Sequence, residues 1–231
     1  MAELSGPDST GLCPDLVPKV TSTHRFEIVF KYMTGTWSMS MRLLPAVTED
    51  AEVIATLRTL VGTHLAAIHG AGHWSRVVSA KDVLKRMATG QVFQVRQRER
   101  VIATLCLTTR KPRAIDPSYF SPVRRPIYLV DMAVDPAHQG QGIGRWCLGE
   151  VERHVEGRSG GAIRLDAYDG PMGASDFYRR CGYREVGRAA YREVSLVYFE
   201  FLSGWRSSIA GALPAPLLRG LGPKSDFSDR P

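Results

Sequence analysis

The chain has 231 residues, a formal charge of +7 and 44% hydrophobic residues, which is ordinary globular usage and excludes a collagen-like or wholly disordered chain. That length accommodates one full domain with a hydrophobic core plus appended tails. Since no window approaches the roughly 18 to 20 uninterrupted apolar residues of a membrane span, we expect a cytoplasmic protein without membrane association.

The predicted elements lie between residues 41 and 202, which we take as the domain. Residues 1–40, whose first half is rich in Gly, Pro, Ser and Thr, are expected to be a peripheral extension. Residues 203–231 are rich in Gly, Pro and Ser, and this tail is expected to be disordered.

The domain is predicted to begin with a strand, two helices and a hairpin. Ser79, with Asp82 three residues later, resembles a capping box for the second helix, which ends near Gly90. Two apolar stretches joined by a polar turn predict an antiparallel hairpin. The strand, the first helix and the two hairpin strands are expected at 42–46, 49–68, 91–96 and 101–109.

A nearly continuous apolar run over 127–134 predicts a central strand buried on both faces, interrupted only by Asp131. A long helix follows over 142–156, because apolar residues recur there at helical spacing. A strand, a short helix and two more strands are expected at 162–168, 173–181, 183–187 and 194–201. The order of elements indicates a mixed α/β fold.

A glycine-rich turn joins the central strand to the long helix, and Gln139, Gly142 and Gly144 give it the pattern QxxGxG. Glycines let the main chain approach an anion closely, and unpaired N–H groups at a helix N-terminus point at anionic oxygens. The turn therefore favours a pyrophosphate site. A merely tight connection would look similar, but the GxGxxG of a dinucleotide-binding turn and the GK[ST] of a Walker loop are absent.

Two segments, YLVDMAVDPAHQGQGIG at 128–144 and ASDFYRRCGY at 174–183, together resemble the GCN5-related N-acetyltransferase (GNAT) family. The resemblance covers residues 41–202. It implies a mostly antiparallel, twisted sheet flanked by helices, with a splayed central strand pair that holds acetyl-CoA as co-substrate and needs no metal.

The resemblance also implies roles for individual residues. Main-chain groups of Met132, Ala133 and Val134 would bond the pantetheine arm. The residues of the turn that would hold the phosphates are Gln139, Gly140, Gln141, Gly142, Ile143, Gly144 and Arg145.

Tyr178 matches the tyrosine that protonates the departing thiolate in the family, although a buried helix tyrosine is the alternative interpretation. Pro171 stands where the family often has an Asn, and Asp169 would replace that Asn only in part.

Asp131 is a candidate catalytic residue, as base or amine anchor, because it is the one acid in an apolar strand. The alternative is an Asp that orders a neighbouring loop. Strand alternation places Tyr128 on the opposite face, where the family sometimes carries a base. A main-chain N–H near Met132 would stabilise the oxyanion. The basic loop 110–125 would bind an acidic acceptor or the CoA 3′-phosphate, or be solvated surface.

These features predict an enzyme that transfers an acetyl group from acetyl-CoA directly to a primary amine of a small-molecule or peptide acceptor. The alternative is a CoA-binding regulatory module with little or no transfer. Specific nucleic-acid binding is not expected, since no recognition-helix signature is present. No Cys or His cluster has metal-ligand spacing, and a homodimer is left open.

Overall fold

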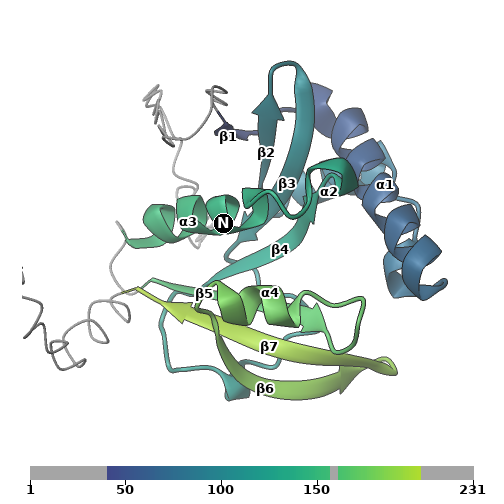
Figure 1. The fold of residues 1–231 in the computed structure, drawn as a ribbon. Helices are drawn as coiled ribbons and strands as arrows, with labels where there is room; N and C mark the ends of the chain where they lie inside the picture. The colour runs from purple at the N-terminus through teal and green to yellow at the C-terminus, as the bar shows by residue number, and fades with distance from the viewer. Residues whose placement is uncertain (1–40, 157–160, 204–231) are drawn as a thin grey trace, which may run out of the picture. The chain divides into compact units, whose positions relative to one another are not determined.

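The computed structural model describes residues 41–156 and 161–203. Seven strands form one sheet in the order β1-β2-β3-β4-β5-β7-β6, in which β4 and β5 are parallel and all other neighbours antiparallel (Figure 1). The predicted mixed α/β fold with a mostly antiparallel sheet is confirmed. The predicted extension over 1–40 and nearly all of the predicted tail lie outside the described residues.

The elements follow the predicted order. The strands are β1 (Arg42–Pro45), β2 (Gln91–Gln97), β3 (Arg100–Thr108), β4 (Ile127–Val134), β5 (Ala162–Tyr168), β6 (Arg184–Tyr191) and β7 (Val194–Leu202). The helices are α1 (Ala51–His69), α2 (Ala80–Met87), α3 (Ile143–Glu156) and α4 (Ser175–Arg180). The central strand β4 and its parallel neighbour β5 have the predicted bounds residue for residue.

The capping box predicted for α2 is confirmed by its hydrogen bonds. The Asp82 N–H donates to Ser79 Oγ over 3.3 Å, and the Ser79 N–H donates to Asp82 Oδ2 over 3.2 Å. Two N–H groups at the helix start are thereby satisfied, which fixes where α2 begins. This position matters because α2 carries a side chain of the site described below.

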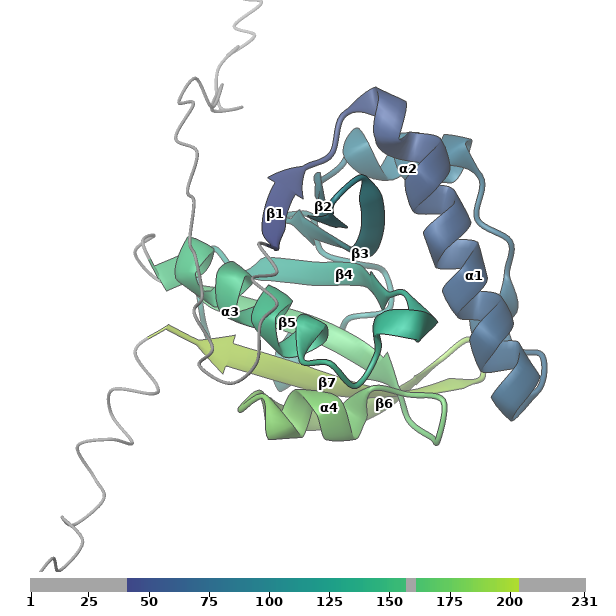
Figure 2. The ribbon, with the colours of Figure 1, turned by 45° about the horizontal axis from the view of Figure 1, so that its top comes forward.

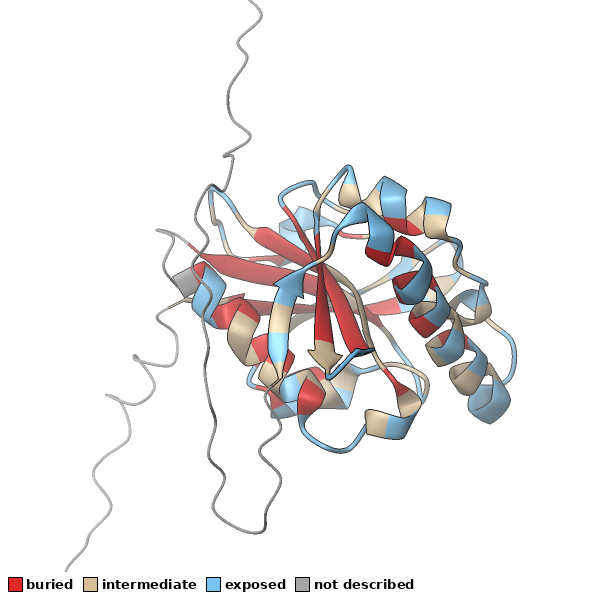
Figure 3. Ribbon diagram, turned by 90° about the horizontal axis from the view of Figure 1, so that it is seen from above, coloured by how far each residue is buried: buried red, intermediate tan, exposed pale blue. Residues whose placement is uncertain are grey.

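The helices cover both faces of the sheet (Figures 2 and 3). Helices α3 and α4 bury one face with a core that includes Leu129, Val151 and Phe199. Helices α1 and α2 bury the other face in a second core cluster, which includes Ile54 of α1 and Cys106 of β3. The buried residues of α1 lie on its side toward the sheet (Figure 3).

Helix α1 and the turn before it form a segment, Thr48–His69, that is long and apolar enough to cross a membrane by length and composition alone. Such a segment was not expected from the sequence. Ala51, Ile54 and Ala55 are buried in the core cluster shared with α2 and the sheet, which is how a domain helix packs. The length and composition of α1 are therefore weak grounds for a membrane role.

A β-bulge interrupts β4 at its middle. The register places Thr104 opposite Ala133 and Cys106 opposite Val130, so two residues of β4 stand against one of β3. Asp131, inside the bulge, has a φ of 56°, in the left-handed region that few non-glycine residues adopt. Bulges of this kind bend a strand and re-aim its side chains.

The bulge overturns the expectation that Tyr128 and Asp131 lie on opposite faces. Its extra residue puts Val130 and Asp131 on the same face, since Val130 packs in the cluster of α1 and α2 and Asp131 binds side chains from those two helices. Tyr128, two residues before Val130, shares that face by alternation. The alternation of side chains along a strand predicts the sheet face of a residue only where no bulge interrupts the strand.

Strands β4 and β5 pair only where they begin. Ile127 lies opposite Ile163 and Tyr128 opposite Arg164, and within the described residues no later pair joins the two strands. Burial of β4 accordingly falls from buried over 127–129 to half-buried over 130–134. The prediction of a strand buried on both faces is right only for its first three residues, because the strands diverge and open a cleft.

Candidate active site

A cleft of about 630 Å³ opens beside the diverging strands. Its walls come from α1, α2, the segment between these helices, the bulged part of β4 and the end of β5. From β4 the lining residues are Asp131, Met132 and Ala133, and from β5 the lining residue is Tyr168. Clefts of this size hold small organic ligands. The strand divergence therefore creates a site of ligand dimensions.

Asp131 sits in the cleft between two arginines. Arg58 of α1 donates from Nη2 to Asp131 Oδ1 over 2.7 Å, and Arg86 of α2 donates from Nε to Oδ2 over 2.6 Å. The Asp131 side chain is 19% exposed. Since each carboxylate oxygen already accepts a charge-assisted hydrogen bond, Asp131 positions α1 and α2 on the bulge. The expected alternative, an Asp that orders a loop through N–H bonds, is not the arrangement observed.

An aromatic pair forms another wall of the cleft. The rings of Trp74 and Tyr168 meet edge-to-face with centroids 5.6 Å apart. The segment carrying Trp74 is fixed to α1, because a Cβ on Gly62 would lie 2.6 Å from the Trp74 carbonyl oxygen, and Thr59 Oγ1 accepts from the Val78 N–H over 3.0 Å. These contacts hold the aromatic wall against α1.

The glycine-rich turn is built as a tight connection into α3. Asp135 caps a 3₁₀ turn over Pro136–His138 by accepting the Ala137 N–H, and Gln139 Nε2 donates to the Val134 carbonyl over 3.1 Å. Gln141 Nε2 donates in turn to the Ala137 carbonyl over 3.1 Å. Two predicted phosphate ligands, Gln139 and Gln141, thus use their side chains to hold the turn, which leaves main-chain groups for an anion.

The backbone conformation of the turn and the space beside it are compatible with a bound phosphate group. Gly140 and Gly142 have φ of 75° and 81°, and a Cβ built on either would meet no atom within 4 Å. Both glycines are thus required by backbone conformation, and the space beside them is open. The N–H groups of the first turn of α3, which begins at Ile143, have no acceptor within the helix. Such a site favours an anion.

Gly144 has a different reason to be glycine. A Cβ there would lie 3.0 Å from the Phe177 ring and 3.6 Å from the Met132 methyl carbon, so this glycine lets α3 pack closely on α4 and β4. Arg145 donates from Nη2 to the Arg180 carbonyl over 2.5 Å. Its guanidinium therefore satisfies a carbonyl at the end of α4 in this structure.

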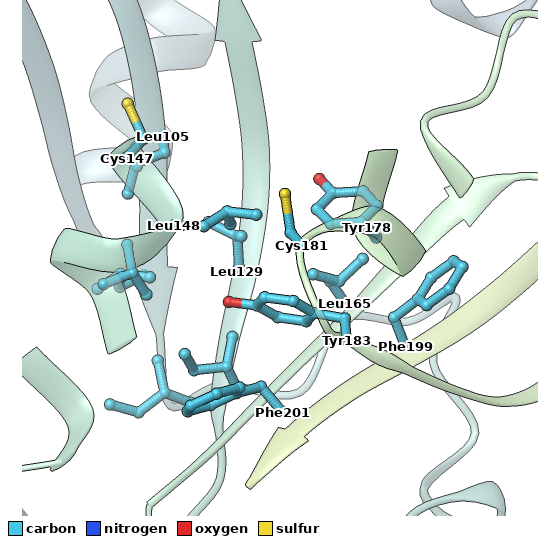
Figure 4. Close-up of a cluster of buried hydrophobic side chains, with 14 of the residues drawn as sticks. Leu105, Leu129, Cys147, Leu148, Leu165, Tyr178, Cys181, Tyr183, Phe199 and Phe201 are labelled. Carbon is cyan, nitrogen blue, oxygen red and sulfur yellow. The ribbon is translucent and has the colours of Figure 1, made fainter. Parts of the chain in front are cut away.

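Tyr178 lies in the core between α4 and the sheet, with 7% of its surface exposed. Figure 4 shows its hydroxyl directed away from the neighbouring ring of Tyr183. The hydroxyl lies 3.9 Å from Met132 Sδ, and Met132 itself lines the cleft. Burial raises the pKa of Tyr178 above its ordinary value, and the charge of Asp166 adds to the shift. The phenol therefore keeps its proton at neutral pH.

Residues 88–185, which include the turn, the bulge and Tyr178, match the family model of the acetyltransferase (GNAT) domain. The chain carries a GNAT acetyltransferase domain. The protein is accordingly an enzyme, an acyltransferase, and the resemblance stated from its two sequence motifs is confirmed.

Solved structures similar to this GNAT domain share its fold at low sequence identity. The ribosomal-protein-S18-alanine N-acetyltransferase from Escherichia coli aligns with TM-score 0.53 and 16% identity, covering 71% of this chain and 94% of that one. The PaiA N-acetyltransferase from Thermoplasma acidophilum, in complex with coenzyme A, aligns with TM-score 0.54 and 14% identity over 71% and 100%. A GNAT acetyltransferase from Streptococcus pneumoniae aligns with TM-score 0.51 and 15% identity over 71% and 99%.

These likenesses establish the fold and leave the acceptor open. A search of the curated proteins finds no significant match to the sequence.

Asp166, on β5 of the GNAT domain, is a candidate catalytic residue that was not predicted from the sequence. Burial raises its pKa, and the negative charge of Asp131 raises it further. It is not itself among the residues that line the cleft, but it shares a sheet face with Tyr168 two residues on, which does line it. Within the described residues no ion pair or side-chain hydrogen bond to its carboxyl is present. The one signal in the sequence is an acid in the predicted strand β5, whose other charged residue is Arg164.

Arg58, Arg86 and Trp74 were also missed, because each becomes a site residue only through tertiary packing. Conversely, the basic loop 110–125 does not contribute to the cleft lining. Lys111 donates instead to the Ile115 carbonyl over 2.9 Å, and Asp116 accepts the Ser118 N–H. Asp169, the expected partial replacement for the family's Asn, pairs with Arg188 over 2.8 Å.

The histidines and cysteines take no metal-site arrangement in the part of the chain that the structure describes. Cys106, Cys147 and Cys181 are free, buried thiols. Burial raises the pKa of Cys106 and of Cys147 to about 12, so both thiols stay protonated and unreactive at neutral pH.

Proposed function

We propose that the protein transfers an acetyl group from acetyl-CoA directly to a primary amine bound in the cleft beside β4. One observation carries this proposal: Met132 connects all parts of the site. It lines the cleft, its methyl carbon lies 3.6 Å from the position of a Cβ on Gly144, and its sulfur lies 3.9 Å from the Tyr178 hydroxyl. A donor held at the turn would therefore reach the cleft beside Tyr178.

The residues fit acetyl-CoA as acyl donor, and coenzyme A is the molecule bound in the Thermoplasma acidophilum structure. Main-chain N–H groups from Gly140 to Arg145 would hold the pyrophosphate. The edge of β4 over Met132–Val134, which β5 leaves open, would pair with the amides of the pantetheine arm. Acetyl-CoA supplies an activated thioester carbonyl.

In the transfer, the neutral amine nitrogen attacks the thioester carbon, and a C–N bond forms as the C–S bond breaks. The main chain at the bulge would donate to the carbonyl oxygen as negative charge develops on it. Tyr178 would give its proton to the departing thiolate. The amine loses a proton, for which Asp166 is the acceptor that we assign, because both Asp131 oxygens are already bound by Arg58 and Arg86.

The assignment of Asp166 predicts a pH effect. A base acts when deprotonated, so kcat/KM of the native protein is expected to fall as pH drops through the raised pKa of Asp166. Asp166→Asn should lower kcat/KM about 100-fold at neutral pH and remove this limb of the profile. The neighbouring groups coupled to Asp166 are Asp131, Tyr168, Tyr178 and Tyr198. An unchanged acid limb in the Asn variant would assign the limb to another group, such as the acceptor amine itself, and would contradict the role of Asp166 as base.

Thermal unfolding supplies the check on folding for the same variant. Since the folded-state pKa of Asp166 is raised, its contribution to the free energy of unfolding is full below the unfolded-state pKa and lost as pH rises through the folded-state pKa. Asn is neutral throughout. The Asn variant should therefore melt at or above the native temperature at neutral pH, so a loss of activity cannot be attributed to unfolding.

The proposed function is tested by following free thiol from acetyl-CoA in the presence of a panel of primary amines. We expect turnover with at least one amine, and none with the N,N-dimethyl derivative of that amine, which has no proton to lose. Absence of turnover across a broad panel, with coenzyme A still bound, would contradict the proposed transfer.

A further inference from the structure

The cleft beside β4 carries more positive charge than its own carboxylates balance. Its charged lining residues are Arg58, Arg76, Lys85 and Arg86 against Asp82 and Asp131, which leaves an excess of two positive charges. Arg76 and Asp82 neutralise one another over 2.9 Å. The excess therefore belongs to Arg58, Arg86 and Lys85, which face a single carboxylate.

Arg58 and Arg86 both retain donors after pairing with Asp131. Arg86 binds the carboxylate through Nε, which leaves its two terminal nitrogens as further donors, and Arg58 binds through one terminal nitrogen. The Arg86 side chain is 38% exposed and the Arg58 side chain 20% exposed, and both line the cleft. Guanidinium groups in this state are suited to hold a second carboxylate.

The wall next to these arginines is apolar. Val61, Leu65 and the aromatic pair Trp74 and Tyr168 line it, and the hydrogen bonds of the Trp74 segment hold it in place. A ligand that fills this cleft therefore meets a cationic floor and a rigid hydrophobic wall.

From this arrangement we infer that the acceptor is a small amino acid: an amine that carries a carboxylate and an apolar side chain. The inference rests on the proposed function. The carboxylate binds Arg58 and Arg86, the apolar group lies against Trp74 and Tyr168, and the amine is left to face Met132.

Two consequences follow from the charge. The nearby cations disfavour an ammonium ion, which raises the fraction of acceptor in the neutral, reactive form. They also repel amines with a second positive charge, so polyamines are poor acceptors. A pocket of this charge selects by repulsion as well as by attraction.

The test compares phenylalanine with phenylalaninamide, and leucine with leucinamide, as acceptors in the thiol-release assay. Each pair keeps the side chain and differs in the carboxylate, and rates are compared per neutral amine, because the amide lowers the pKa of the neighbouring ammonium group. We expect kcat/KM to be about 10- to 100-fold higher for the acids, which is the effect of a hydrogen bond to a charged group. Spermidine should be inactive. Binding of each acceptor to the protein loaded with coenzyme A is measured in parallel by calorimetry.

The matched variants are Arg86→Gln and Lys81→Gln, both on α2. Arg86→Gln leaves Asp131 paired with Arg58 and should abolish the preference for the acids in both turnover and binding. Lys81 is exposed and lies outside the cleft lining, so Lys81→Gln should retain the preference.

The outcomes separate this inference from the proposed function. Turnover that is equal for acids and amides, or higher for the amides, would overturn the amino-acid assignment and leave the transferase intact. Binding of the acids without turnover would support the assignment and contradict the transfer. Failure of every acceptor to bind the loaded protein would overturn the assignment.

Discussion

Tyr178→Phe is expected to lower kcat about 100-fold or more, the usual contribution of a positioned general acid, with little change in the KM for acetyl-CoA. The phenol is buried beside Met132, and its raised pKa keeps it protonated where a proton must be given. The contact of its hydroxyl with the Met132 sulfur, at 3.9 Å, is a weak one, so removing the hydroxyl should hardly change the free energy of unfolding. Steady-state kinetics with acetyl-CoA and the best amine of the panel measure the effect.

Tyr183→Phe is the matched control. Tyr183 lies in the same core, with its ring centroid 5.9 Å from that of Tyr178 (Figure 4), and the hydroxyl that contacts the cleft residue Met132 is that of Tyr178. Its substitution should leave kcat within a few-fold of the native value, roughly the range expected for a residue that makes no transition-state contact. An unchanged kcat in Tyr178→Phe would contradict the role of Tyr178 as general acid, whereas tight binding of coenzyme A without turnover in the native protein would favour the regulatory module considered from the sequence.

The features that were predicted well from the sequence are those that depend on residues close together in the chain. The apolar run of β4, the capping box at Ser79 and the glycines at 140 and 142 each act through neighbours in the chain, so their positions could be inferred before any packing was known. The two motifs named the family for the same reason, since each lies within one continuous segment.

The parts that were not predicted are long-range. Asp131 stood out as an acid in an apolar strand, but its partners are 73 and 45 residues away, on two different helices. Nothing in the local pattern indicates the bulge either, because its register depends on β3. The cleft and its excess charge thus depend on contacts that one sequence does not encode locally, which is why the acceptor could be addressed only from the structure.

Gly142→Val is expected to weaken the affinity for coenzyme A about 100-fold or more, through the loss of charge-assisted bonds from the main chain to the pyrophosphate. Gly142 has a φ of 81°, which a β-branched residue adopts only with strain of about 1 to 2 kcal/mol. Its side chain would also enter the open space beside the turn. Calorimetry with coenzyme A gives the dissociation constant, and thermal unfolding reports the strain separately.

The control for this substitution lies on α3, the helix that follows the turn. Gly149→Ala places a Cβ where no atom lies within 4 Å and should stabilise α3 by up to about 1 kcal/mol without changing the affinity. A second comparison uses S-acetyl-pantetheine, which has no pyrophosphate. If Gly142→Val impairs transfer from this donor as severely as transfer from acetyl-CoA, the turn acts through the fold and not through the phosphates. An effect confined to acetyl-CoA shows that the turn acts on the nucleotide part of the donor, which carries the pyrophosphate and the 3′-phosphate and is absent from S-acetyl-pantetheine.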